Sequence, residues 1–363
     1  MLPVTFRILP EHMNRIIQYT SLLGILLLLV VIVAAGTGAM HMSPLQVIAI
    51  LLERTGIHLP VAYTEQMVAV LWVIRLPRVV LAVLVGAGLG LAGASLQGLF
   101  RNPLADPALI GVSAGASVTA AIMIVLQPVL FAVHAGQSTG IWQSYAHNLI
   151  TFAGAILTVW VVFRISVYGN RAIVAVMLLG GIAINALCGA FTGLMTYVAD
   201  NEQLRSITFW TLGSLGGASW QTVTAVLPFV LAPAVLLPRM APALNVFALG
   251  EQEAMHSGVK VNTLKTQLII YSTMAVAAGV AVAGIIGFIG LVVPHMIRQL
   301  TGPDHRVLIP CAALAGAVLL TVADLLSRTI IAPAELPVGI ITAIAGAPVF
   351  IWLILKEKRT MTV

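Results

Sequence analysis

Long apolar runs without a charged side chain recur along the whole chain, and no other feature constrains its fold as strongly. A helix needs about 20 such residues to cross a hydrocarbon core roughly 30 Å thick, and the chain supplies them repeatedly. Only 8% of its 363 residues are charged, whereas soluble domains have about 25%. The sequence therefore predicts an all-α polytopic membrane protein, a single membrane domain embedded in a lipid bilayer.

Uncharged stretches give ten candidate membrane spans. They lie near residues 21–40, 79–100, 108–133, 148–163, 172–198, 221–238, 266–283, 285–297, 307–326 and 336–355. Two longer uncharged stretches contain breaks, one at Gly213–Ser219 and one at Gly284–Pro294. Each break predicts a short or irregular helix beside a full span. Because lipid does not tolerate exposed non-helical backbone, we expect the breaks to face protein or a water-filled path.

The basic residues indicate which end of each span faces the cytoplasm. With ten spans and a cytoplasmic N-terminus, five arginines lie outside (Arg54, Arg75, Arg78, Arg205 and Arg328), which leaves the other 13 of the 18 Lys and Arg residues inside. This asymmetry fits the positive-inside rule, with both termini in the cytoplasm. We predict a cytoplasmic segment at 1–20, a membrane domain at 21–355 that includes a cytoplasmic segment at 239–265, and a cytoplasmic tail at 356–363. The basic residues are scattered singly, which argues against a nucleic-acid partner.

Three of the outer arginines lie at predicted helix ends. Arg75 and Arg78 open the second span, and Arg328 closes the ninth. Their charges could snorkel to lipid headgroups, and Arg328 could pair with Asp324 one helical turn earlier. They could equally form a docking site for an acidic partner.

A polar segment inside the cell separates the sixth and seventh spans. Its middle, Leu249–Gly258, predicts a short amphipathic helix that Gly258 ends. A connector alone could be much shorter, so we expect this helix to dock a cytosolic partner.

Small residues recur every four positions in the second span, at Gly86, Gly90, Ala94 and Gly98. On a helix they form one stripe that another helix can approach closely. Tight packing is the commoner use of such a stripe, and the wall of a conduit is the alternative.

The sequence lacks the residues that a catalytic or energy-converting site requires. No Gly-Lys dipeptide occurs, so a phosphate-binding P-loop is excluded. Asp324 is the only acid near a span, so the buried carboxylates of ion-coupled carriers are missing too. We find no catalytic constellation and no metal-ligand spacing among the eight histidines. We therefore predict a transport subunit without catalytic residues or a metal site, which takes its energy from another subunit.

Five segments carry a specific resemblance. They are the run RLPRVVLAVLVGAGLGLAGASLQGLFRNPLADPALIGVSAGAS at Arg75–Ser117, and Phe209–Trp220, Leu249–Val259, Gly284–Arg306 and Glu335–Phe350. Together they closely resemble the FecCD-type permease family for iron chelates, cobalamin and heme, the membrane subunits of type II ABC importers. It extends over nearly the whole chain from about Leu22, in the family's order. Only the first twenty residues and the Gln137–His147 loop lie outside it.

The resemblance implies a homodimer of ten-helix subunits in the bacterial inner membrane, with one path at the interface. It also implies two cytosolic ATPase subunits, which would bind ATP and Mg²⁺, and a periplasmic binding protein. The family's docking arginines match Arg75, Arg78 and Arg328. Its ATPase-coupling helix matches Leu249, Gly250, Glu251, Glu253, Ala254, His256 and Gly258. Candidates for the translocation path are Gly86, Gly90, Ala94, Gly213, Ser214, Gly284, Gly287 and Gly290.

The transported substrate is predicted from one stretch and one histidine. The stretch Gly181–Trp220 is most similar to the heme branch, and His256 adds to this impression. A ferric siderophore and cobalamin are the alternatives within the family, and an ion-coupled secondary carrier is the alternative outside it. Met40-His41-Met42 could contact a heme iron, although interfacial residues are the simpler interpretation. We expect heme as cargo and no cofactor bound by this chain.

Overall fold

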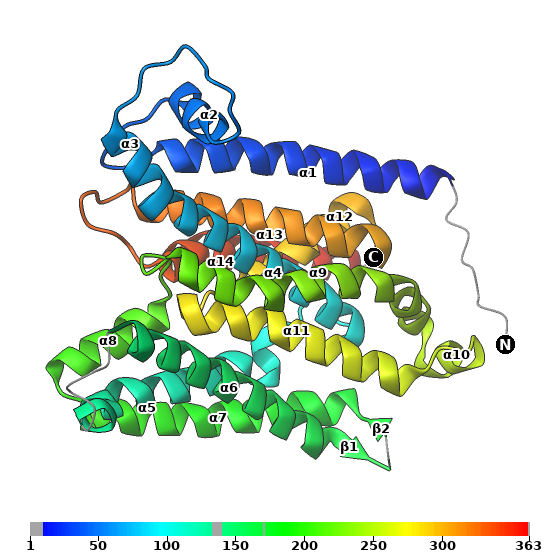
Figure 1. Ribbon diagram of the computed structural model, residues 1–363. Helices are drawn as coiled ribbons and strands as arrows, with labels where there is room; N and C mark the ends of the chain where they lie inside the picture. The colour runs from blue at the N-terminus through cyan, green and yellow to red at the C-terminus, as the bar shows by residue number, and fades with distance from the viewer. Residues whose placement is uncertain (1–9, 133–139, 170, 362–363) are drawn as a thin grey trace.

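The structure is a computed structural model that describes residues 10–132, 140–169 and 171–361 (Figure 1). Its first seven α-helices are α1 (Pro10–Gly36), α2 (Pro44–Glu53), α3 (Glu65–Val70), α4 (Leu76–Phe100), α5 (Val112–Ala132), α6 (Gly140–Ser166) and α7 (Val174–Val198). The remaining seven are α8 (Asn201–Leu212), α9 (Trp220–Leu249), α10 (Glu251–His256), α11 (Val261–Ala283), α12 (Ile289–Thr301), α13 (His305–Ser327) and α14 (Val338–Met361). A π-helical turn η1 (Leu71–Arg75), a 3-10 turn η2 (Pro107–Ile110) and a hairpin of two short strands, β1 (Val167–Tyr168) and β2 (Arg171–Ala172), complete the chain.

The predicted all-α membrane fold with about ten spans is confirmed. Eight helical segments in the described part of the chain are long and apolar enough to cross a membrane. The two others are α5 and α12, of which α12 has only 13 residues. At 1.5 Å per residue it is about 20 Å long, which is shorter than the hydrocarbon core. This short helix follows the break predicted near Gly284.

Several helices extend well beyond the predicted bounds of their spans. The first, α1, begins at Pro10 rather than near residue 21. The second spanning helix begins at Glu65 rather than near residue 79, because α3, η1 and α4 continue one another. The sixth, α9, continues past residue 238 to Leu249 and contains four prolines, and α11 begins at Val261 rather than near 266. The fourth, α6, begins at Gly140, so most of the expected Gln137–His147 loop is helical, and its first three residues lie outside the described ranges. In two of these helices the charged residues are bonded inside the fold, namely Arg75 and Arg78 in the second span and Lys265 in α11.

Helix α4 forms the centre of the bundle. Nearly all of its residues are buried, and it packs against α13, α11, α9 and α12. Helices α5, α6 and α7 pack on one another and form a group beside this centre, with α11 in contact with α6 (Figure 1).

The two ends of the bundle carry different elements. Helices α2, α3 and α8 lie at one end, whereas α10 and the β1–β2 hairpin lie at the other (Figure 1). Helix α1 begins and α14 ends at the α10 end. This arrangement agrees with the predicted topology, in which both termini and the polar segment after the sixth span share one side of the membrane.

Candidate functional site

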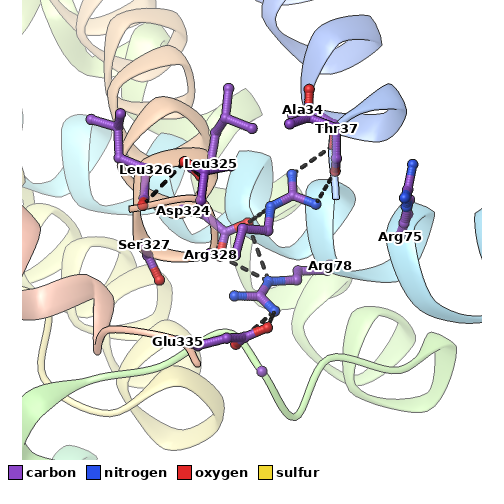
Figure 2. Close-up of polar contacts among 12 residues, drawn as sticks. Ala34, Thr37, Arg75, Arg78, Asp324, Leu325, Leu326, Ser327, Arg328 and Glu335 are labelled. Atoms are coloured by element: carbon purple, nitrogen blue, oxygen red, sulfur yellow. Dashed lines mark hydrogen bonds and ion pairs between the residues drawn. The ribbon is translucent and has the colours of Figure 1, made fainter. Parts of the chain in front are cut away.

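Arg75 and Arg78 lie inside a continuous helix, not at the helix end that the sequence predicted. They are three residues apart, so both point to the same side of the helix. Arg75 is 4% exposed and Arg78 is 8% exposed. Arg328 follows the last residue of α13, as predicted, and its side chain is also nearly buried. We call these three residues with Asp324 and Glu335 the arginine cluster (Figure 2).

Arg75 binds the end of α1 through backbone carbonyls alone. Its Nη1 donates to the carbonyl oxygens of Ala35 and Gly36 at 2.9 and 2.8 Å, and its Nη2 donates to that of Met40. The last carbonyls of a helix have no partner within the helix and carry partial negative charge. The guanidinium therefore caps the end of α1 without a carboxylate partner among the described residues.

Arg78 binds two carboxylates at once. Its Nε lies 2.9 Å from Asp324, and its Nη1 lies 2.8 Å from Glu335. Asp324 is fully buried on α13, whereas the Glu335 side chain, on the loop before α14, is 45% exposed. Arg78 thus joins α4, α13 and the entrance of α14, and Glu335 is the part of this junction that a second molecule could reach.

Arg328 completes the cluster, and its pairing with Asp324 is confirmed. Its Nε lies 3.5 Å from Asp324, and its terminal nitrogens donate to the carbonyl oxygens of Ala34 and Thr37 at 2.6 and 3.1 Å (Figure 2). Three arginines face two carboxylates, so the cluster carries an excess of one positive charge. The carbonyls at the end of α1 and the two acids enclose the three arginines, so little of their guanidinium surface is open to a partner.

The short helix α10 forms as predicted and ends where Gly258 was expected to end it. The N–H of Val259 donates to Ala254, and that of Gly258 donates to Met255, which closes the helix in the Schellman manner. Gly258 has a φ of +82°, which glycine adopts without strain. Gly250 separates α10 from α9, so Leu249 belongs to α9 rather than to α10.

One face of α10 is fastened to the bundle and the other is open. Ala254 is fully buried, whereas Glu253, Met255 and His256 are exposed, as is Leu249 just before the helix. A cleft of about 400 Å³ lies beside the helix, between Glu251 and Met255 on one side and the start of α11 on the other. The open face therefore offers apolar and acidic side chains together.

Lys265 holds α10 in place, and sequence reasoning did not single it out. Its Nζ lies 2.8 Å from both carboxylate oxygens of Glu251 and 2.8 Å from the carbonyl oxygen of Ala172. The Lys265 side chain is 2% exposed. One buried ammonium on α11 thus bonds both α10 and the β1–β2 hairpin. Glu251 is the residue through which α10 is held to α11.

The two predicted breaks in the helices lie against each other. The N–H of Ser214 donates to the carbonyl of Ala283 at 2.8 Å. Gly213 and Gly284 have φ values of +71° and +69°. A Cβ on Gly213 would overlap the carbonyl oxygen of Ile285, and one on Gly284 would overlap that of Trp210 near the end of α8. The expectation that the breaks face protein is therefore met, and both glycines are required by the close approach.

The small-residue stripe on α4 packs closely against α13. A Cβ on Gly86 would overlap the carbonyl of Gly316, and one on Gly90 would overlap that of Ala312, both on α13. Ala94 is fully buried, and Gly290 packs against Pro107. Gly86, Gly90 and Ala94 are therefore covered by other helices of the same chain in this structure, and their place on the path stays a prediction. Ser214 is exposed and Gly287 has open space beside it, so these two could line a path.

Within the described residues, no group of three or more His, Cys, Asp or Glu side chains could hold a metal ion. Met42 is buried in a small core cluster with Ala35 and Val47, whereas His41 is exposed. The pair therefore does not present both side chains to one ligand.

The model of the FecCD transport family matches residues 26–356. The chain belongs to the FecCD transport family. Among its relatives, the hemin transport system permease protein HmuU of Yersinia pestis is 43% identical over 96% of this chain and 99% of its own length. The vitamin B12 import system permease protein BtuC of Salmonella typhi is 41% identical over 79% of this chain and 84% of its own.

A solved structure agrees with the fold of this FecCD permease. An inward-facing metal-chelate-type ABC transporter has a TM-score of 0.80, at 31% identity, over 93% of this chain and 99% of the other. The predicted family, the type II permease fold and the multi-pass inner-membrane location are thereby confirmed. The chain is the permease subunit of an ABC importer, and the family implies ATPase and substrate-binding partners, with ATP and Mg²⁺ carried by the ATPase.

Proposed function

We propose that this chain is the permease of a heme importer, moving heme from a periplasmic binding protein across the inner membrane. The observation that carries the proposal is the extent of similarity to the hemin permease, which covers almost the full length of both chains. The similarity to the vitamin B12 permease leaves about a fifth of this chain unmatched. Heme would be cargo, and no cofactor would reside in this chain.

Uptake by the reconstituted transporter tests the proposal. Proteoliposomes would contain the permease with its ATPase, and they would receive the binding protein loaded with heme, a ferric siderophore or cobalamin. We expect ATP-dependent uptake of heme alone, and growth of a strain with heme as its sole iron source should depend on this chain. Faster uptake of a ferric siderophore or of cobalamin than of heme would identify that compound as the transported substrate. Uptake without the ATPase would instead indicate a secondary carrier.

The open face of α10 is the surface we propose for the ATPase. Met255 and Leu249 are exposed and apolar beside Glu253 and His256, which suits a contact with a cytosolic protein. Met255→Glu should abolish substrate-stimulated ATP hydrolysis and leave assembly unchanged, because its side chain has no role in the core. Asn14→Glu adds the same charge at the start of α1 and serves as the control. Normal coupling in Met255→Glu would remove α10 from the contact.

The arginine cluster is the surface we propose for the binding protein, at the end of the bundle opposite α10. Its excess positive charge favours an acidic partner, and the exposed Glu335 occupies the position that a partner's carboxylate would take on Arg78. Glu335→Gln should therefore tighten binding and strengthen its salt dependence, since exposed charges are screened over about 8 Å at physiological ionic strength. Weaker binding by Glu335→Gln, or affinity independent of salt, would contradict docking at this site.

A second copy of the chain is the partner we propose for α7. This helix exposes Leu179, Ile182 and Tyr197. Gly189 and Gly193 lie one helical turn apart with nothing near them, so another helix can approach closely. We place the path between the two copies, near Ser214 and Gly287. Gly193→Cys should form a disulfide with its counterpart under oxidation, whereas Gly24→Cys on α1, where a Cβ would also meet open space, should not.

A further inference from the structure

An apolar groove lies between α6 and α11, away from the surfaces discussed above. Its cavity is about 480 Å³ and is lined mainly by Val159, Trp160, Phe163, Ile269, Ile270 and Met274. Trp160 and Ile270 are about half exposed at its rim. Arg164 is the one charged residue among the lining residues.

The groove opens at the α10 end of the bundle. Helix α6 ends at Ser166, α11 begins at Val261, and the bond from Lys265 to Ala172 joins these two ends. The lining residues then run from Arg164 to Ile156, which is about 12 Å along a helix. One half of a hydrocarbon core is about 15 Å deep. The groove therefore follows most of one leaflet, with its charge at the headgroup level.

The charge at the mouth of the groove is positive and has no acidic partner. In the described ranges no carboxylate pairs with Arg164, whose guanidinium lies 6.0 Å from the Trp160 ring. Arg171 is exposed on the hairpin that follows α6, and Lys260 is exposed just before α11. A groove between spanning helices with basic residues on the cytoplasmic side suits an anionic lipid headgroup above an acyl chain.

We propose that this groove binds one anionic phospholipid of the inner leaflet, with an acyl chain between α6 and α11 and its phosphate at Arg164. The lipid would fill the space beside the helix that carries Lys265, and so support the position of α10. The headgroup assignment rests on the proposed orientation, with α10 in the cytoplasm. Lipid binding is measured without transport, so it can fail or succeed independently of the proposed cargo.

Native mass spectrometry of the purified permease tests the proposal, with phosphatidylglycerol and phosphatidylcholine of identical acyl chains as probes. The wild-type protein should retain more phosphatidylglycerol than phosphatidylcholine. Arg164→Gln should lower that retention about fivefold, roughly the contribution of one basic residue near the membrane surface, whereas Arg164→Lys should preserve it. Ile270→Trp should block the groove and lower retention of phosphatidylglycerol. Arg239→Gln removes an exposed charge on α9 outside the groove and should change nothing.

Four results would overturn the proposal. Equal retention of the two lipids, or the same loss in Arg239→Gln as in Arg164→Gln, would show unspecific surface binding. A loss of both lipids in Ile270→Trp with none in Arg164→Gln would show an acyl chain held without headgroup recognition. A disulfide between two copies carrying Met274→Cys would show that a second chain covers the groove.

Discussion

Removing the Glu251 carboxylate is expected to destabilise the protein more than removing the Lys265 ammonium with which it pairs. The two charges are 2.8 Å apart, so they attract by about 6 kcal/mol at an effective dielectric constant of about 20. Much of this attraction offsets the desolvation of Lys265, which is 2% exposed. The Glu251 side chain is 38% exposed and can be hydrated when its partner is lost. An unpaired Lys265 therefore costs more free energy of folding than an unpaired Glu251 does.

The magnitudes follow from this difference in exposure. Glu251→Ala leaves a buried ammonium with only the Ala172 carbonyl, so we expect a loss of about 3 kcal/mol in the free energy of unfolding, the lower end for a broken buried pair. Lys265→Met leaves a hydrated carboxylate and places an apolar side chain near Phe247, which should cost about 1 kcal/mol. The double variant should also lose about 1 kcal/mol, and so be more stable than Glu251→Ala alone.

Unfolding of the permease in mixed micelles, titrated with sodium dodecyl sulfate, measures these free energies. Glu253→Ala is the matched control, because this residue is an exposed carboxylate on the same helix, and it should lose less than about 0.5 kcal/mol. The reasoning would be refuted if Lys265→Met lost more stability than Glu251→Ala. It would also be refuted if the two losses were additive in the double variant, since paired groups must couple.

Three further predictions concern other parts of the chain. Gly90→Val should prevent stable assembly, because its side chain would overlap α13. Gly24→Val on α1, where a Cβ would meet open space, should assemble normally in size-exclusion chromatography. Arg78→Met should lower the free energy of unfolding by about 3 kcal/mol, because Asp324 would keep only the longer contact to Arg328. The double variant Arg78→Met with Asp324→Leu should recover part of this lost stability. The permease without its binding protein should show no stoichiometric six-coordinate heme spectrum, and a spectrum lost in His41→Ala would contradict this.

The sequence predicted the elements that depend on local signals. Apolar runs predicted the spans, and the glycines at 213 and 284 predicted where helices break. Gly258 predicted the end of α10. Each of these signals lies within a few residues of the feature it predicts.

Features that depend on distant contacts were not predictable in the same way. A stripe of small residues looks alike whether it faces a helix of the same chain or a conduit, and only the position of α13 decides in favour of packing at Gly86 and Gly90. Lys265 bonds Glu251 on α10 and the Ala172 carbonyl on the hairpin, and no local pattern links these three residues. Phe288 adopts a φ of +68° at the second break, and no local sequence pattern predicted this left-handed conformation.

The arginine cluster shows why charge alone is an incomplete guide to a docking surface. In the sequence, Arg75, Arg78 and Arg328 are three cations at one face with a single acid nearby. In the structure, backbone carbonyls at the end of α1 bind Arg75 and Arg328. A count of charged residues in the sequence does not include such carbonyl partners. The excess positive charge is therefore held inside the fold, and the exposed Glu335 stands between it and the surface. A partner would meet this charge by replacing one carboxylate on Arg78, so affinity for the partner should depend on Glu335 as much as on the arginines.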